Sequence, residues 1–218
     1  MTTPTDILVR RPPAATLADV VIPAPGSDLA GRLLRAVVLV AGGAALTALS
    51  AQLSFKMPWT EVPYTGQTAA VLLVGTALGW RLGAASMLLY LLIGIAGGPV
   101  FSDGAHGIDQ LLGYTGGYLV AFVLAAALVG RLAERGWDRS PASTAALMVV
   151  GSLLIYAIGV PVLALVLQMT PADAIWNGAI VFVPWDAFKV LVAAALLPLA
   201  WRAVGRRDPA RDGPPDGD

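Results

Sequence analysis

The chain has 218 residues, of which 57% are hydrophobic and only 13% are charged, and its formal net charge is zero. Soluble domains usually carry about 25% charged residues, and a water-soluble fold of this length could not bury so much apolar surface. The absence of excess basic charge argues against a nucleic-acid-binding protein. With no cysteine and a single histidine, the sequence excludes disulfides and thiolate metal sites and argues against a histidine-built metal centre.

The two ends of the chain differ in composition from the part between them. Residues 1–30 are rich in Pro, Thr and Asp and contain no early apolar run of the kind that marks a signal peptide. Residues 204–218 are mostly Pro, Gly and charged residues, which cannot build a core. We therefore predict disordered cytoplasmic segments at 1–30 and 204–218, flanking one domain over 31–203.

Long uncharged runs predict six transmembrane helices, because about 20 apolar residues cross a bilayer as a helix. Only Trp80-Arg81 and a glycine separate the second and third helices, so a single longer helix is the alternative there. However, 62–102 is too long for one crossing, and the glycines of LGWRLG (78–83) are placed like helix ends. The predicted helices cover approximately 33–52, 66–80, 82–97, 114–133, 143–168 and 178–202.

The lysines and arginines outside these spans predict how the helices are oriented. With six helices and both termini inside, twelve basic residues lie on the inner side and only Lys56 lies on the outer side. An excess of basic residues marks the cytoplasmic side of a membrane protein, and five or seven helices would break the alternation. We therefore expect an all-α integral membrane protein with six transmembrane helices and cytoplasmic termini.

The first predicted helix carries small residues at a spacing of four in AGGAALTALSA (41–51). Such faces allow helices to approach closely in lipid. Packing within the chain and docking of a partner protein are equally compatible with the pattern. The residues concerned are Ala41 and Ala45 on one line, and Ala44 and Ala48 on the next.

Two segments on the expected outer side break the helical pattern. In 54–70, two prolines, aromatics and β-branched residues favour an extended hairpin, which is either an ordinary connection or a cap over a cavity. The segment 97–119 is rich in glycine but lacks the lysine of a phosphate-binding loop. Its Gly116-Gly117 pair permits either tight helix packing or close approach of a ligand. His106 is interpreted as a solvated loop residue.

Two charges interrupt the last predicted helix. Asp186 and Lys189 are three residues apart and therefore share one helix face. A charge at mid-membrane costs several kcal/mol, and intramembrane ionisable residues are by default functional. Pro184 can begin a new helical stretch and leave backbone amides free nearby. We favour binding of a polar solute; a self-neutralising structural pair, or a pair near water at the helix mouth, remain alternatives.

Several of these segments together resemble the BioY family, the biotin-binding substrate-capture (S) subunits of energy-coupling factor (ECF) transporters. The matching stretches are 57–101, 113–122 and 183–196, within a resemblance that spans about 35–200. Their ordered motifs P-x-T-x-Q-T, R-L-G-A, G-x-T-G-G-Y and P-x-D-x-x-K are specific only in combination. The chain departs from the usual family pattern at Tyr114, in place of Pro, and at Trp185, where a larger side chain beside the Asp is expected to reshape the pocket.

The resemblance implies an ECF S-component bundle that binds biotin with high affinity and serves its uptake across the bacterial cytoplasmic membrane. It implies no enzymatic activity and no cofactor. Expected partners are a transmembrane coupling protein, docked on the small-residue face of the first helix, and cytoplasmic ATPase subunits that use ATP. The implied biotin-binding residues are Asp186, Lys189, Tyr118 and Gly117, with Gln67 and Tyr90 on matching segments.

Four other functions are alternatives to biotin capture by an S subunit. The chain could capture another small vitamin, or it could transport biotin alone without ATPase partners. An intramembrane enzyme using Asp186 as acid or base lacks a second well-placed carboxylate, a Ser–His pair and a metal cluster. A purely structural membrane protein would keep all activity when Asp186 becomes Asn.

Overall fold

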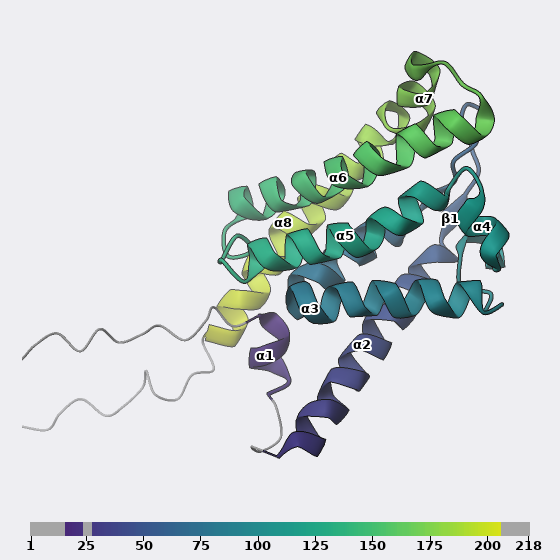
Figure 1. Cartoon of the computed structure of the whole chain (residues 1–218). Helices are drawn as coiled ribbons and strands as arrows, with labels where there is room; N and C mark the ends of the chain where they lie inside the picture. Colours follow the sequence, from purple (N-terminus) through teal and green to yellow (C-terminus); the bar gives the residue numbers. More distant parts are fainter. Residues whose placement is uncertain (1–15, 24–27, 206–218) are drawn as a thin grey trace, which may run out of the picture.

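The computed structural model describes residues 16–23 and 28–205, and this part of the chain is helical apart from one small hairpin (Figure 1). Strand β1 (Ser54–Phe55) pairs antiparallel with β2 (Tyr64–Thr65). Within the described residues, five segments are long and apolar enough to cross a membrane. The long helices are α2 (Leu29–Ala51), α3 (Gln67–Ile95), α5 (Gly116–Ala133), α6 (Pro141–Leu167) and α8 (Val183–Gly205); the short ones are α1 (Leu17–Val21), η1 (Ser102–Gly104), α4 (Ile108–Leu112), α7 (Pro171–Gly178) and η2 (Ile180–Phe182).

Helix α3 is a helical hairpin with a break at Gly79. This glycine has φ +80° and ψ 175°, a backbone conformation that disfavours any residue with a side chain. The side-chain amide nitrogen of Gln67 lies 2.6 Å from the hydroxyl of Tyr90, whereas a straight helix would place these residues about 35 Å apart. The two limbs, 67–78 and 80–95, are therefore antiparallel, which confirms the predicted break within 78–83.

The predicted hairpin at 54–70 is also confirmed, by the pairing of β1 with β2. The predicted start of the last helix at 178 is wrong, because α8 begins at Val183 after the separate turns of α7 and η2. Ala179 leaves helical geometry with φ −139° and ψ −57°. Pro184 occupies the first turn of α8, where a proline's missing N–H costs nothing.

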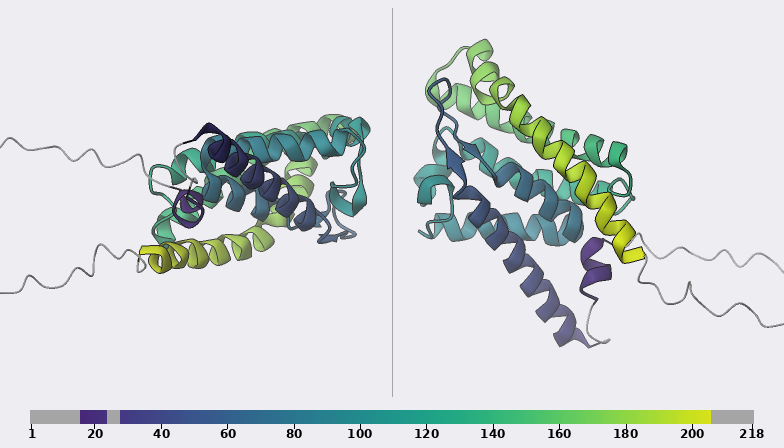
Figure 2. Two further views of the ribbon diagram at one scale, coloured as in Figure 1. Left: turned by 90° about the horizontal axis from the view of Figure 1, so that it is seen from below. Right: turned by 180° about the vertical axis from the view of Figure 1, so that it is seen from behind.

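The core forms around α5, which lies between α3 and α6. Small side chains of α5, including Ala121 and Ala125, are fully buried. A Cβ on Gly117 would lie 2.7 Å from the Val162 side chain of α6, so the glycine pair at this helix start serves close packing. Helix α8 runs along α6 and touches α3 at fewer places (Figure 2).

The two small-residue lines of α2 have different environments. Ala44 is buried in the core, and Ala48 packs against it. Ala41 and Ala45 are exposed on the outer surface of the bundle. One line therefore serves packing within the chain, and the other is open to lipid or to a partner.

Only part of each terminal segment predicted to be disordered falls within the described residues. Residues 16–23 include α1, whose Asp19 carboxylate is 2.9 Å from the guanidinium of Arg35 on α2. Arg35 also donates to two backbone carbonyls of the same segment. The other residues of 1–30, apart from 28–30, and residues 206–218 lie outside the described part of the chain.

Candidate functional site

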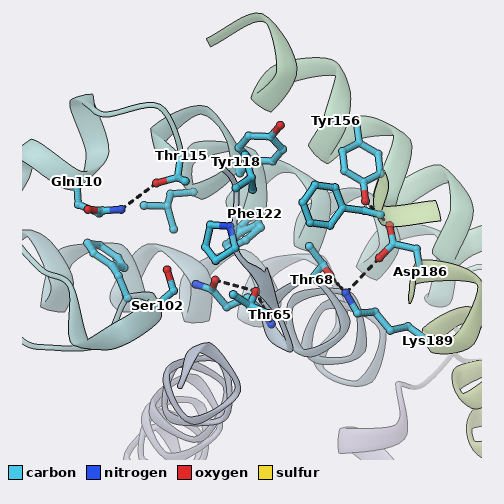
Figure 3. A pocket seen from close by; sticks show the side chains of 16 residues that line it. Thr65, Thr68, Ser102, Gln110, Thr115, Tyr118, Phe122, Tyr156, Asp186 and Lys189 are labelled. Atoms are coloured by element: carbon cyan, nitrogen blue, oxygen red, sulfur yellow. Dashed lines mark hydrogen bonds and ion pairs between the residues drawn. The ribbon is translucent and has the colours of Figure 1, made fainter. Parts of the chain in front are cut away.

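A cavity lies between the β1–β2 hairpin and helices α3, α5, α6 and α8 (Figure 3). The hairpin and α7 lie at the end of the bundle opposite α1 (Figure 1). The empty space of the cavity amounts to about 590 Å³ when the open solvent at its mouth is counted, and about 60 Å³ of it is accessible to the centre of a water molecule. Its lining comprises one charged pair, a group of aromatic rings and several uncharged polar side chains. The lining residues are Val62, Pro63, Thr65, Gln67, Thr68, Phe101, Ser102, Gln110, Thr115, Tyr118, Leu119, Phe122, Tyr156, Phe182, Asp186 and Lys189.

The predicted charged pair forms one end of this cavity. The ammonium of Lys189 lies 3.1 Å from one carboxylate oxygen of Asp186, and the side chains are only 13% and 12% exposed. The same ammonium donates to the hydroxyl of Thr68 at 2.6 Å. The hydroxyl of Tyr156 donates to the second carboxylate oxygen. The network therefore joins α3, α6 and α8 at one point (Figure 3).

This network gives the charged groups of Asp186 and Lys189 hydrogen-bond partners and leaves both residues on the cavity wall. A buried charge is tolerable when it is paired and its remaining hydrogen-bonding capacity is used. Asp186 is 9% exposed and sits in the first turn of α8. The pair is thus neutralised internally, yet both residues line the cavity. The structural and the ligand-binding interpretations are therefore compatible with one another.

The other end of the cavity is polar but uncharged. The amide of Gln110, on α4, donates to the hydroxyl of Thr115 at 2.9 Å, and Ser102 lies on the same side (Figure 3). The ring of Phe122 lies between this end and the charged pair (Figure 3), and Phe182 is among the other aromatic residues of the lining. The cavity suits a ligand with a strongly hydrogen-bonding head, an apolar middle and a polar tail.

The β1–β2 hairpin covers the cavity and is attached to the segment before α8. The hydroxyl of Tyr64 donates to the carbonyl of Val181 at 2.6 Å, and the hydroxyl of Thr60 donates to the carbonyl of Asn177 at 2.7 Å. Val62, Pro63 and Thr65 of the hairpin contribute to the lining. The interpretation of this segment as a cap over a cavity is the one that the structure favours.

The structure brings four of the six predicted ligand residues to the cavity. Asp186, Lys189, Gln67 and Tyr118 line it. The hydroxyl of Tyr118 already donates a hydrogen bond to the carbonyl of Gly178 at 2.9 Å. The other two do not line it. Gly117 faces α6, and Tyr90 is fully buried behind Gln67, with its ring edge-on to Phe101 at 5.4 Å.

Two members of the charged network were missed by sequence reasoning. Thr68 directly follows Gln67 in the P-x-T-x-Q-T motif, a signal that could have identified it. Tyr156 is the only tyrosine in the apolar run 143–168, but this does not place it near Asp186. Trp185 is not a lining residue of the cavity. Its ring stacks on Phe188 with centroids 5.5 Å apart, and its indole nitrogen is 3.4 Å from the carbonyl of Thr65.

Comparison with known proteins gives a consistent result. The model of the BioY family matches residues 18–206. The biotin transporter BioY of Rhizobium etli is 34% identical over 170 residues, covering 74% of this chain and 90% of the relative. The biotin transporter BioY of Thermotoga maritima is 38% identical over 141 residues, covering 65% and 82%. The fold matches the crystal structure of an S-component for biotin from an ECF-type ABC transporter, with a TM-score of 0.72 and 19% identity over 81% of this chain and 95% of that one.

The family match extends over nearly all of the described residues, including every element that lines the cavity. No group of three or more potential metal-ligating side chains occurs in 16–23 and 28–205. The apolar helices identify a multi-pass membrane protein. The chain belongs to the BioY family.

Proposed function

We propose that this chain captures biotin as the S subunit of an ECF-type transporter in the cytoplasmic membrane and serves its uptake. The relatives in Rhizobium etli and Thermotoga maritima are biotin transporters. The observation that carries the proposal is the buried Asp186–Lys189 pair on the wall of a partly aromatic cavity. Burial of an ionic pair in a membrane helix costs free energy. Because this pair lies on a cavity wall, it can contact a bound ligand.

The ureido ring of biotin is complementary to the charged end of the cavity. The ring offers two N–H donors and one carbonyl acceptor, so Asp186 can accept from an N–H and Lys189 can donate to the carbonyl. Hydrogen bonds that involve a charged group are the stronger kind, more so in a site shielded from water. A carboxylate has about four acceptor positions, and Lys189 and Tyr156 occupy two of them. Asp186 can therefore accept a ligand N–H while keeping its present partners.

Charge also supports one orientation of the ligand. A valerate carboxylate placed beside Asp186 would bring two anions together, whereas no acidic residue lines the opposite end of the cavity. We assign the carboxylate to the end formed by Gln110, Thr115 and Ser102. The aromatic rings between the two ends would then contact the thiophane ring and the valeryl chain.

The distribution of charge supports six crossings with both termini in the cytoplasm, the limbs of α3 counting as two. Among the described residues, the end with the cavity carries one lysine against four carboxylates: Lys56, Glu61, Asp103, Asp109 and Asp173. The other end carries seven arginines against four carboxylates: Arg32, Arg35, Arg81, Arg131, Arg135, Arg139 and Arg202, with Asp19, Asp28, Glu134 and Asp138. Basic residues favour the cytoplasmic side, so the cavity would open outward.

Uptake against a gradient would require partners, a transmembrane coupling protein and cytoplasmic ATPase subunits that use ATP. The exposed Ala41–Ala45 line of α2 is the proposed docking face, since small residues let a partner helix approach closely. Large apolar side chains on the same helix, such as Val37 and Leu49, are also more than 60% exposed. The Ala44–Ala48 line is already used within the chain.

Calorimetric titration of the purified full-length protein tests the ligand assignment. We expect saturable binding of one biotin per chain and no binding of thiamine or riboflavin. Binding of either other vitamin in place of biotin would reassign the cavity to a different solute. Uptake by reconstituted vesicles with and without coupling and ATPase subunits would distinguish an S subunit from a stand-alone biotin transporter.

A further inference from the structure

A second hollow lies on the opposite side of the hairpin from the cavity, and it is strongly aromatic. Three of the chain's six tryptophans line it, and two of them, Trp59 and Trp176, are 54% and 59% exposed. We call it the aromatic cleft, and none of its lining residues is charged. It is lined mainly by Met57, Trp59, Tyr64, Trp176, Val181 and Trp185.

The aromatic cleft and the cavity share their dividing wall. Tyr64, Val181 and Trp185 line the cleft, and the residue that follows each of them in the chain lines the cavity. The wall is closed by the bond from the Tyr64 hydroxyl to the Val181 carbonyl and by contact of the Tyr64 ring with Phe182, centroids 4.5 Å apart. A molecule in the cleft therefore lies one layer of chain away from the candidate site.

The charge at this end of the bundle determines which part of a ligand the cleft can hold. The single lysine, Lys56, is 3.0 Å from Asp103 and is thereby neutralised, and the other three carboxylates leave this end acidic. An anion approaching it is repelled at long range. An uncharged ring is not repelled, and indole faces offer it large, rigid contact area. The first contact of an anionic ligand is therefore through its ring.

We propose that the aromatic cleft is an outer subsite that holds the uncharged ring of a small anionic vitamin before it passes the hairpin into the cavity. The inference rests on the proposed function, because it takes the ligand of the cavity to be such a molecule. It assigns the cleft to the entry route and not to the final bound state. Loss of the indole faces should therefore slow entry and exit together and leave the final affinity unchanged.

The test is rapid-filtration measurement of tritiated biotin association and dissociation on the full-length protein in lipid nanodiscs. We expect the double variant Trp59→Ala/Trp176→Ala to lower both rate constants at least threefold, with Kd within twofold of the unaltered protein. The matched control is Trp137→Ala, an exposed tryptophan (40%) in the loop between α5 and α6 at the other end, which should change neither rate.

Unchanged rates in the double variant would show that the cleft takes no part in ligand entry and would overturn the inference. Faster dissociation with unchanged association would also overturn it, because the two tryptophans would then support the closed cavity itself. Failure of the unaltered protein to bind biotin would reject the proposed function, and the inference with it, and is distinguishable from both results.

Discussion

Two buried carboxylates with different surroundings define the two ends of this bundle. Asp186 faces a cavity and has an ammonium, a tyrosine hydroxyl and free space around it. Asp138, in the loop between α5 and α6, is fully buried and lines neither the cavity nor the aromatic cleft. One of its oxygens accepts the indole N–H of Trp201 at 2.6 Å, and the Arg139 guanidinium stacks on that indole at 4.6 Å.

The comparison shows that burial of a charge does not by itself mark a binding site. Asp138 closes the end opposite the cavity by linking a loop to α8, and burial raises the pKa of its carboxyl group, partly offset by the Trp201 hydrogen bond. Asp186 differs in having accessible space on one side. We therefore expect substitutions of Asp186 to lower ligand affinity, and substitutions around Asp138 to change folding stability without changing affinity.

The largest effect is expected for Lys189→Ala. It leaves the carboxylate of Asp186 buried without its cation, which typically costs about 3–5 kcal/mol of folding free energy. Biotin affinity should fall at least tenfold in the same variant. The double variant Asp186→Asn/Lys189→Gln removes both charges and should regain thermal stability but not affinity. Recovery of binding by the uncharged pair, measured by calorimetry, would assign the pair to structure alone.

Asp186→Asn should weaken biotin binding at least tenfold, which corresponds to about 1.4 kcal/mol or more. The amide keeps one acceptor oxygen but loses the charge that strengthens its bond to a ureido N–H. The matched control is Asp138→Asn, also a neutralised buried carboxylate, for which calorimetry should give an unaltered affinity. Equal losses of biotin affinity in the two variants would contradict the assignment of ligand binding to Asp186 and not to Asp138.

Trp201→Phe should lower folding stability by about 1–3 kcal/mol, because the buried Asp138 carboxylate loses its indole donor. Thermal unfolding in detergent, monitored by circular dichroism, would measure this change. Biotin affinity should stay within twofold of the unaltered protein. A large loss of affinity would instead couple the loop at 134–140 to the cavity.

The smallest effect is a pH dependence at Asp138. Since its pKa is raised in the folded state, the folded protein binds a proton more readily than the unfolded chain, and stability falls as pH rises through the folded pKa. The unaltered protein should therefore gain thermal stability relative to Asp138→Asn as pH is lowered from 7 toward 4. A constant difference in melting temperature across that range would contradict the assignment.

Much of the fold was predictable because local chemistry specifies it. The glycines of 78–83 predicted the break at Gly79, and the prolines of 54–70 predicted the hairpin. The start of α8 was not predictable from hydropathy, since the apolar run continues through η2 into the helix. The chain leaves helical geometry at Ala179 before α8 begins, and hydropathy does not report that backbone conformation. In the sequence, only Pro184 indicated that a helix starts nearby.

The site was predictable where its residues stand out from their own segments. Asp186 and Lys189 are charges within an apolar helix, so their three-residue spacing was enough to assign them to one face of α8. Tyr156 enters the network only because α6 runs beside α8, and spacing along one segment carries no such information. Tyr90 was assigned to the ligand, but the turn at Gly79 places it behind Gln67.

The bend in α3 has a consequence for the surrounding lipid. On the proposed six-crossing topology its first limb, 67–78, crosses the bilayer by itself, yet this limb is about 18 Å long and the hydrocarbon interior of a typical bilayer is about 30 Å thick. Hydrophobic mismatch of this size is relieved by local thinning of the bilayer or by irregular chain that lies below the headgroups under protein cover. Gln67 begins this limb on the cavity wall, so on that topology a locally thinner bilayer would shorten the distance that a water-soluble molecule must descend to the site.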